Sequence, residues 1–251
     1  MERVKSEKPL EKPESINPEI TKNFVGFIKE KSESGIYRVE VKVGDKIVPI
    51  DVFPTVFPPQ SDYSASSKSL FETFKNLDGA KVADVGSGSG VESIIAIMAG
   101  ANHVDAGDIN QQAVNCSRHN AEINGLKEKI EVFYSNLFQE FPKKKYNLII
   151  ANLPIVDFGA EKDNINASLY DKDLEIHRKF FAEAKNYLAE DGVILIPHAN
   201  LQSAKTSNPN YDFQILEQLI GESGFEVVGK SERKDLGYEW INYKIKLKKI
   251  I

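Results

Sequence analysis

The stretch KVADVGSGSGVESIIAIMAGA, residues 81–101, decides the fold of this chain. Its first five residues form an apolar run of strand length, and the residues after the third glycine have helical periodicity. Between the two lie Gly86, Gly88 and Gly90. Glycine tolerates a positive φ and lets a ligand approach the backbone, and the start of the following helix presents free N–H groups. The pattern indicates a ligand-binding strand–turn–helix unit, with a purely structural turn as the alternative.

Short apolar segments alternate with helical ones from residue 79 onward, which predicts βαβ units. We expect strands at 81–85, 103–107, 130–134, 146–151, 193–197, 225–232 and 240–248. We expect helices at 64–77, 91–100, 111–124, 172–189 and 213–223. The predicted fold class is therefore α/β, a Rossmann-like, seven-stranded and mostly parallel sheet with helices on both faces.

The segment before the glycine turn has a different pattern. Residues 1–15 are charged and indicate a loosely attached arm, and Asn17 can cap a helix that follows it. Apolar residues alternate on both sides of a Gly-Asp turn over 37–53, which predicts a β-hairpin. We divide the chain into an arm, helix and hairpin that shape the substrate side, 1–60, and an α/β domain, 61–251.

Composition restricts the class of protein. The 251 residues, 41% of them hydrophobic, suit one α/β domain with an appendage. No apolar stretch reaches the roughly 20 residues of a membrane helix, and the charged start is unlike a signal peptide, so we expect a cytoplasmic protein. A single cysteine excludes an internal disulfide, and four scattered histidines predict no metal site. The net charge of −5 disfavours nucleic acid as a partner without excluding a local basic patch.

Asp108 ends the second expected strand, where doubly wound folds place a carboxylate beside a bound ribose; it can also cap the next helix. With this residue, 79–200 resembles the class I S-adenosylmethionine-dependent methyltransferases. Residues 84–90 match their D-x-G-x-G-x-G loop, and DINQQAV with NAEINGL resembles their second motif. A nicotinamide-binding fold is the competitor, but its G-x-G-x-x-G would place Val91 at the third glycine.

The resemblance implies S-adenosylmethionine as the cofactor. Asp108 would accept hydrogen bonds from both ribose hydroxyls, and Ile109 would lie against the adenine. Asn136 stands where many relatives carry an aspartate that bonds the adenine amino group, and its carbonyl can accept the same bond. The residues implied in cofactor binding are Asp84, Gly86, Gly88, Gly90, Asp108, Ile109, Asn136 and Asn152.

A second motif, Asn152-Leu153-Pro154-Ile155, follows the strand expected at 146–151. It resembles the Asn/Asp-Pro-Pro-aromatic motif of the amino-methylating branch, which includes release-factor glutamine methyltransferases and rRNA guanine-N2 methyltransferases. The resemblance implies that Asn152 and Pro154 are catalytic. The Asn152 side chain and the Leu153 carbonyl would orient a nitrogen acceptor toward the methyl group. Alternatively, the four residues only end a buried strand.

The stacking aromatic of that motif is absent, because Ile155 occupies its position. Four aromatic residues could replace it on the substrate side: Phe53, Phe57, Tyr63 and Phe158. His198 follows an apolar strand and is a candidate general base, with a structural role as the alternative. His177 lies in the helix expected at 172–189 and is predicted at the surface. The polar insertion at 156–180 is expected to cover the substrate, unless it is disordered.

The predicted function is methylation of a nitrogen atom in a small molecule or a protein amide. Methylation of ribosomal or transfer RNA is the alternative within the same fold, favoured by kinship and opposed by the net charge. The alternative from another class is a module that binds S-adenosylmethionine without catalysis, because Leu153 and Ile155 depart from the motif.

Overall fold

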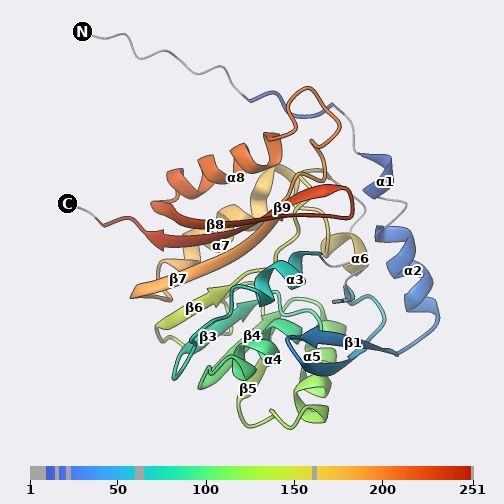
Figure 1. Ribbon diagram of the computed structural model, residues 1–251, viewed down its shortest axis with the longest axis vertical. Helices are drawn as coiled ribbons and strands as arrows, with labels where there is room; N and C mark the ends of the chain where they lie inside the picture. Colours follow the sequence, from blue (N-terminus) through green and yellow to red (C-terminus); the bar gives the residue numbers. More distant parts are fainter. Residues whose placement is uncertain (1–9, 15–16, 21–23, 60–64, 160–162, 250–251) are drawn as a thin grey trace.

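Within the described residues, a seven-stranded sheet forms the centre of the fold (Figure 1). The computed structural model describes residues 10–14, 17–20, 24–59, 65–159 and 163–249. The strand order is β5-β4-β3-β6-β7-β9-β8; β9 is antiparallel to both of its neighbours and the other pairs are parallel. The strands are β3 (Lys81–Val85), β4 (His103–Asp108), β5 (Ile130–Tyr134), β6 (Tyr146–Ile150), β7 (Leu188–Ala199), β8 (Phe225–Asp235) and β9 (Tyr238–Leu247). This topology confirms the predicted fold class.

Helices cover both faces of the sheet (Figure 1). Alternate residues of a strand point to opposite faces, and the buried side chains divide accordingly. Val82 and Leu148 belong to the cluster beneath α3, α4 and α5, whereas Ala83 and Ile149 belong to the cluster beneath α7 and α8. The helices that pack on the sheet are α3 (Ala65–Phe71), α4 (Val91–Met98), α5 (Gln111–Ile123), α7 (Glu175–Ala184) and α8 (Tyr211–Glu222).

Two expected helices end early. The helix expected at 64–77 ends at Phe71. The helix expected at 172–189 ends at Ala184, because Leu188 already pairs with Tyr146 as the first residue of β7. The strand expected at 193–197 is therefore longer at its amino end. The sequence pattern did not indicate residues 188–192 as strand, because Glu190 and Asp191 are exposed and interrupt the apolar run.

The amino-terminal part contributes a hairpin, β1 (Tyr37–Val43) and β2 (Lys46–Val52), and two short helices, α1 (Pro18–Ile20) and α2 (Gly26–Glu33). The hairpin pairs as predicted, and its inward side chains, Val41 and Ile50 among them, join the buried cluster of α4 and α5. Figure 1 shows it beside α5. The boundary expected at residue 60 lies outside the described residues.

A third buried cluster lies where β7 and β9 meet the amino-terminal helices. It joins Ile20 and Ile28 to Ile155, Leu201 and Trp240. The insertion between β6 and α7 contains α6 (Asn164–Ala167) and a 3-10 turn (Lys172–Leu174). No described helix combines the length and apolar character needed to span a membrane.

Candidate active site

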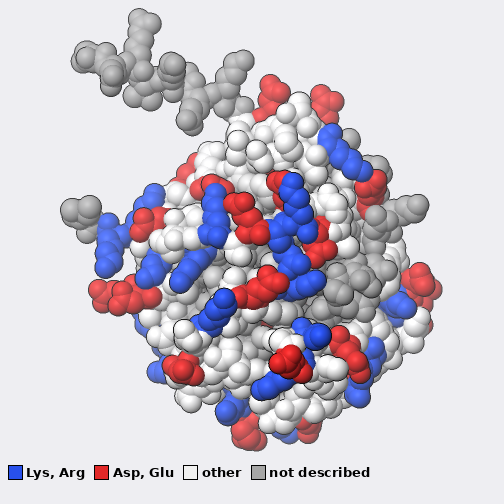
Figure 2. Space-filling view, in the orientation of Figure 1, with Lys and Arg blue, Asp and Glu red and all other residues white. Residues whose placement is uncertain are grey.

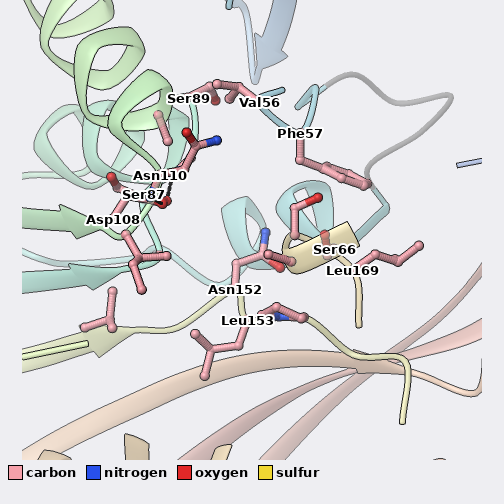
Figure 3. A pocket seen from close by; sticks show the side chains of 18 of the residues that line it. Val56, Phe57, Ser66, Ser87, Ser89, Asp108, Asn110, Asn152, Leu153 and Leu169 are labelled. Atoms are coloured by element: carbon pink, nitrogen blue, oxygen red, sulfur yellow. Dashed lines mark hydrogen bonds between the residues drawn. The ribbon is translucent and has the colours of Figure 1, made fainter. Parts of the chain in front are cut away.

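A cavity of about 440 Å³ opens at the carboxyl ends of β3, β4, β5 and β6 (Figure 3). The loops that follow these four strands supply its floor, while the segment after β2 and the insertion after β6 contribute further walls. Its wall includes Val56, Phe57, Ser66, Gly86, Gly88, Asp108, Ile109, Asn136, Asn152, Leu153, Pro154 and Leu169. This is the edge where ligands bind in open α/β sheets.

The glycine turn after β3 has two distinct tasks. Gly88 lines the cavity at φ +52°, and a Cβ added there would meet nothing within 4 Å. Gly90 has φ +79° and does not line the cavity; its added Cβ would lie 2.5 Å from Ser117 Oγ on α5. The second glycine of the turn, Gly88, leaves room for a ligand, whereas the third, Gly90, permits close packing of α4 against α5.

Asp108 lies at the end of β4, facing the glycine turn. Its Oδ2 accepts a hydrogen bond from the Gly88 N–H at 2.9 Å, and its Oδ1 accepts one from the Asn110 N–H at 2.8 Å. Loss of hydration raises the pKa of the Asp108 carboxyl, although the backbone donors act in the opposite direction. Ile109 beside it is 55% exposed and presents an apolar flank to the cavity.

Asn110, which sequence reasoning did not select, links three elements around this carboxylate. Its Oδ1 caps α5 by accepting from the Gln112 N–H at 3.0 Å and also accepts from Asn164 Nδ2 at 3.3 Å. Its Nδ2 donates to the carbonyl and hydroxyl oxygens of Thr55, both at 3.2 Å. An asparagine just before an expected helix signals the cap, but not the two distant partners.

Asn152 follows β6 and lies beside the first turn of α4. Its Nδ2 donates to Glu92 Oε1 at 3.0 Å and to Ser67 Oγ at 3.3 Å. The Ser67 hydroxyl in turn donates to Glu92 Oε1 at 2.6 Å. Glu92 and Ser67 line the cavity with Asn152, and no motif or spacing in the sequence indicated either residue.

Two carboxyl groups are buried near the glycine turn. Burial and, to a smaller extent, the nearby Glu92 raise the pKa of Asp84 to about 8, against the opposing effect of the Ser93 hydroxyl, which donates to its Oδ2 at 2.5 Å. Burial also raises the pKa of Glu92. Asp84 Oδ1 has no hydrogen-bond partner among the described residues. Asp84 lies outside the lining of the cavity.

Of the four candidate aromatics, Phe57 lines the cavity, across from Leu153 (Figure 3). Phe53 packs on the ring of His119, with ring centroids 5.4 Å apart, and Phe158 lies under Lys12 Nζ, which is 5.4 Å from its ring centroid. Neither lines the cavity. Tyr63 lies outside the described residues.

His177 and His198 are buried next to each other, with ring centroids 5.9 Å apart. His198 is absent from the cavity wall and 1% exposed; burial lowers its pKa to about 3, so the ring is neutral. The prediction that His177 lies at the surface was wrong. It is fully buried, with Nδ1 2.7 Å from Asp171 Oδ2, because it shares the inward face of α7 with Phe180, Phe181 and Ala184.

At the opposite end of the sheet, ligand atoms of His103, Asp105 and Glu131 lie within 4.8 Å of one another. The sequence analysis did not find this grouping, because Glu131 comes from the neighbouring strand. The Asp105 carboxylate already forms an ion pair with Lys144 Nζ at 2.5 Å and accepts a hydrogen bond from the Tyr146 hydroxyl at 2.6 Å. Its charge is therefore balanced by a lysine, and the cluster resembles a structural ion pair more than a metal centre.

A family model described as the methyltransferase small domain matches residues 52–229 of this chain. A putative protein N5-glutamine methyltransferase of Methanocaldococcus jannaschii is 32% identical over 164 residues, which cover 63% of this chain and 79% of that protein. A ribosomal protein L11 methyltransferase of Caldanaerobacter subterraneus is 44% identical over 75 residues, 30% of this chain, and the match spans only 24% of that protein.

The fold also resembles a solved 16S rRNA N2 methyltransferase of T. Thermophilus, in complex with AdoMet and guanosine. The TM-score is 0.58 at 17% sequence identity, with 83% of this chain and 50% of that chain covered. At this identity the likeness concerns the fold alone.

Proposed function

Because this chain belongs to the methyltransferase small domain family, we propose that it transfers a methyl group from S-adenosylmethionine to a nitrogen atom of a small molecule or a protein amide. The observation that carries the proposal is the position of Asn152 in the same cavity as Gly88 and Asp108. The expected binding site of the methyl donor and the residue that would orient the acceptor therefore line one cavity.

The described residues fit the cofactor. The oxygens of Asp108 each accept one backbone N–H and keep further lone pairs for two ribose hydroxyls. Exposed Ile109 offers an apolar flank for the adenine, and Asn136 also lines the cavity. When bound, S-adenosylmethionine supplies a methyl group already activated by its sulfonium centre.

The acceptor side rests on Asn152 and the residue after it. The Asn152 Oδ1 and the Leu153 carbonyl accept hydrogen bonds from the N–H groups of the acceptor, and this directs the nitrogen lone pair toward the methyl group. Pro154 stiffens the chain at this point. The N–H groups of Ile155 and Val156 both donate to the Leu169 carbonyl, at 3.1 and 2.9 Å, and so hold the end of the motif against the insertion.

Phe57 replaces the stacking aromatic that the motif lacks at Ile155. It faces the cavity from the segment after the hairpin, so a planar acceptor can lie between Phe57 and the Asn152 motif. Leu153 and Ile155 contribute apolar wall on the motif side. The acceptor therefore needs a polar nitrogen end and an apolar or planar body.

Surface charge favours a small-molecule or protein acceptor over RNA. Figure 2 shows Lys and Arg side chains interspersed with Asp and Glu over the visible face. On β8, Lys230 Nζ lies 2.7 Å from Glu217, and Lys234 Nζ lies 3.0 Å from Glu239. Cations that are paired in this way offer little attraction for a phosphate backbone.

The test is transfer of labelled methyl from S-adenosylmethionine into cell extract, followed by separation of small molecules, protein and RNA. We expect N-methyl product in the small-molecule or protein fraction. We also expect Asn152→Ala to lower turnover about 100-fold, as loss of reactant alignment does, without changing cofactor affinity. Label in RNA would overturn the acceptor class, and unchanged turnover of Asn152→Ala would overturn its role. Tight cofactor binding without any transfer would indicate a non-catalytic module.

A further inference from the structure

We propose that Glu92 and Ser67 are positioning residues that determine which end of the Asn152 side-chain amide faces the acceptor. The proposal rests on the proposed function of Asn152. The three side chains come from α4, α3 and the end of β6, and hydrogen bonds of 2.6, 3.0 and 3.3 Å join each of them to the other two.

The orientation of the amide matters because its two ends are alike in shape and opposite in hydrogen bonding. With Oδ1 toward the acceptor, Asn152 accepts an N–H and leaves the nitrogen lone pair available for methyl transfer. With Nδ2 toward the acceptor, Asn152 would donate a hydrogen bond to that lone pair and compete with the transfer. An active site built on this residue therefore needs a means to keep the amide from flipping.

The three-residue cluster provides that means, because each of its bonds has a fixed direction. Glu92 Oε1 accepts hydrogens from both Ser67 and Asn152, which an ionised carboxylate oxygen and the carbonyl oxygen of a protonated acid can both do. The Ser67 hydroxyl gives its single hydrogen to Glu92, so its oxygen accepts from Asn152 Nδ2. The two acceptor oxygens are themselves only 2.6 Å apart, so both lie on one side of Nδ2 and hold the NH₂ end of the Asn152 amide there. The flipped amide would instead set its oxygen against a carboxylate oxygen.

Burial supports a role for Glu92 beyond packing. The residue is 4% exposed, and none of the described Lys, Arg and His residues forms an ion pair with it. A buried acid without a basic partner is costly to keep, even at the amino end of a helix. An apolar residue at this place in α4 would pack without that cost and would not orient Asn152.

The test observes the amide directly, in the whole chain and without acceptor. Asparagine is labelled with ¹⁵N, and the Asn152 NH₂ signals are identified by their absence from the Asn152→Ala spectrum. We expect slow exchange with water of the NH₂ hydrogen that faces Glu92 and Ser67 in the native chain, and exchange at least about tenfold faster in Ser67→Ala and Glu92→Met. Glu92→Gln, which keeps an acceptor oxygen, should restore most of the protection. Equal protection in all variants would overturn the proposal.

Ser69→Ala is the matched control. Ser69 lies on the same helix and is 3% exposed, as Ser67 is, but its hydroxyl donates to the Ser66 carbonyl at 2.7 Å. Its replacement should leave the Asn152 signals unchanged. A change equal to that of Ser67→Ala would show that α3 acts only through packing, and so would equal effects of Glu92→Met and Glu92→Gln.

A kinetic arm separates this proposal from the proposed function. With the methyl-accepting fraction as substrate, Ser67→Ala and Glu92→Met should lower kcat about tenfold at unchanged KM for S-adenosylmethionine, and neither should matter once Asn152 is Ala. Full activity of Asn152→Ala would defeat the proposed function itself. An inactive Asn152→Ala beside fully active Ser67→Ala and Glu92→Met would defeat the positioning role alone.

Discussion

The backbone N–H of Gly88 donates a hydrogen bond to the Asp108 carboxylate at 2.9 Å. This bond joins the glycine turn after β3 to the end of β4, the neighbouring strand in the sheet. Asp108 consequently holds the turn in shape, and in the proposed function it also offers lone pairs to the ribose.

Asp108→Ala should therefore weaken S-adenosylmethionine binding about 10- to 100-fold, because it removes hydrogen bonds to a charged group worth roughly 1.5–3 kcal/mol. Isothermal titration calorimetry measures the change. Asp108→Asn keeps the shape and one acceptor oxygen, so its affinity should be intermediate. A dissociation constant equal to that of the native chain would place the ribose elsewhere.

Gly90→Ala should destabilise the fold by about 2–4 kcal/mol, since a positive φ and an overpacked contact add their costs. The added Cβ would lie 2.5 Å from Ser117 Oγ and 3.1 Å from Ser117 Cα. Urea unfolding measures the loss. Gly88→Ala is the control: its Cβ meets nothing within 4 Å, so only the backbone cost of about 1–2 kcal/mol remains. Equal losses in the two variants would refute the packing explanation.

Asp84 should make stability fall with rising pH. Its folded pKa, about 8, lies above the ordinary value of 3.8, so the folded state holds a proton that the unfolded chain has released between these values. The contribution of this residue to the free energy of unfolding is complete below about pH 4 and is lost as the pH rises through 8. The free energy of unfolding, measured in urea at roughly pH 5, 6.5 and 8, should decline less steeply with pH for Asp84→Asn than for the native chain. Parallel declines would contradict the assignment.

Phe57→Ala should raise KM for the acceptor about tenfold and leave the affinity for S-adenosylmethionine unchanged, because the ring provides a stacking surface. Phe57→Tyr should retain most of the function. Phe158→Ala is the comparison, since its ring packs under Lys12 and lies outside the cavity wall. Steady-state kinetics with the methyl-accepting fraction as substrate measures the acceptor KM of both variants. An unaltered acceptor KM in Phe57→Ala would reject the stacking role.

Much of the fold was predictable because its signals are local. The apolar runs that begin at Lys81, His103 and Ile130 each became a strand, and the Gly44-Asp45 turn closed the predicted hairpin. His177 was missed although its spacing from Phe180, Phe181 and Ala184 marks the buried face of a helix. The prediction relied on histidine being a polar residue type, whereas the helical periodicity of the same segment places His177 on the buried face.

The substrate side was less predictable. Phe53, Phe57 and Phe158 are the same residue type in segments of similar composition, yet only Phe57 lines the cavity. The direction of each ring depends on what packs around it: His119 holds Phe53, and Lys12 lies over Phe158. Sequence can name such candidates without ranking them.

By itself, the sequence determined the α/β class, the strand–turn–helix unit and the two motifs, since these depend on residues close together along the chain. Only the tertiary structure decided that Asn152 meets Glu92 and Ser67, which lie 60 and 85 residues away. The pairing of β3 with β6, with Asp84 opposite Ile150, brings the segments after both strands to the same edge of the sheet. Hydrogen bonds that span such separations follow from strand order and register, which neighbouring residues do not encode.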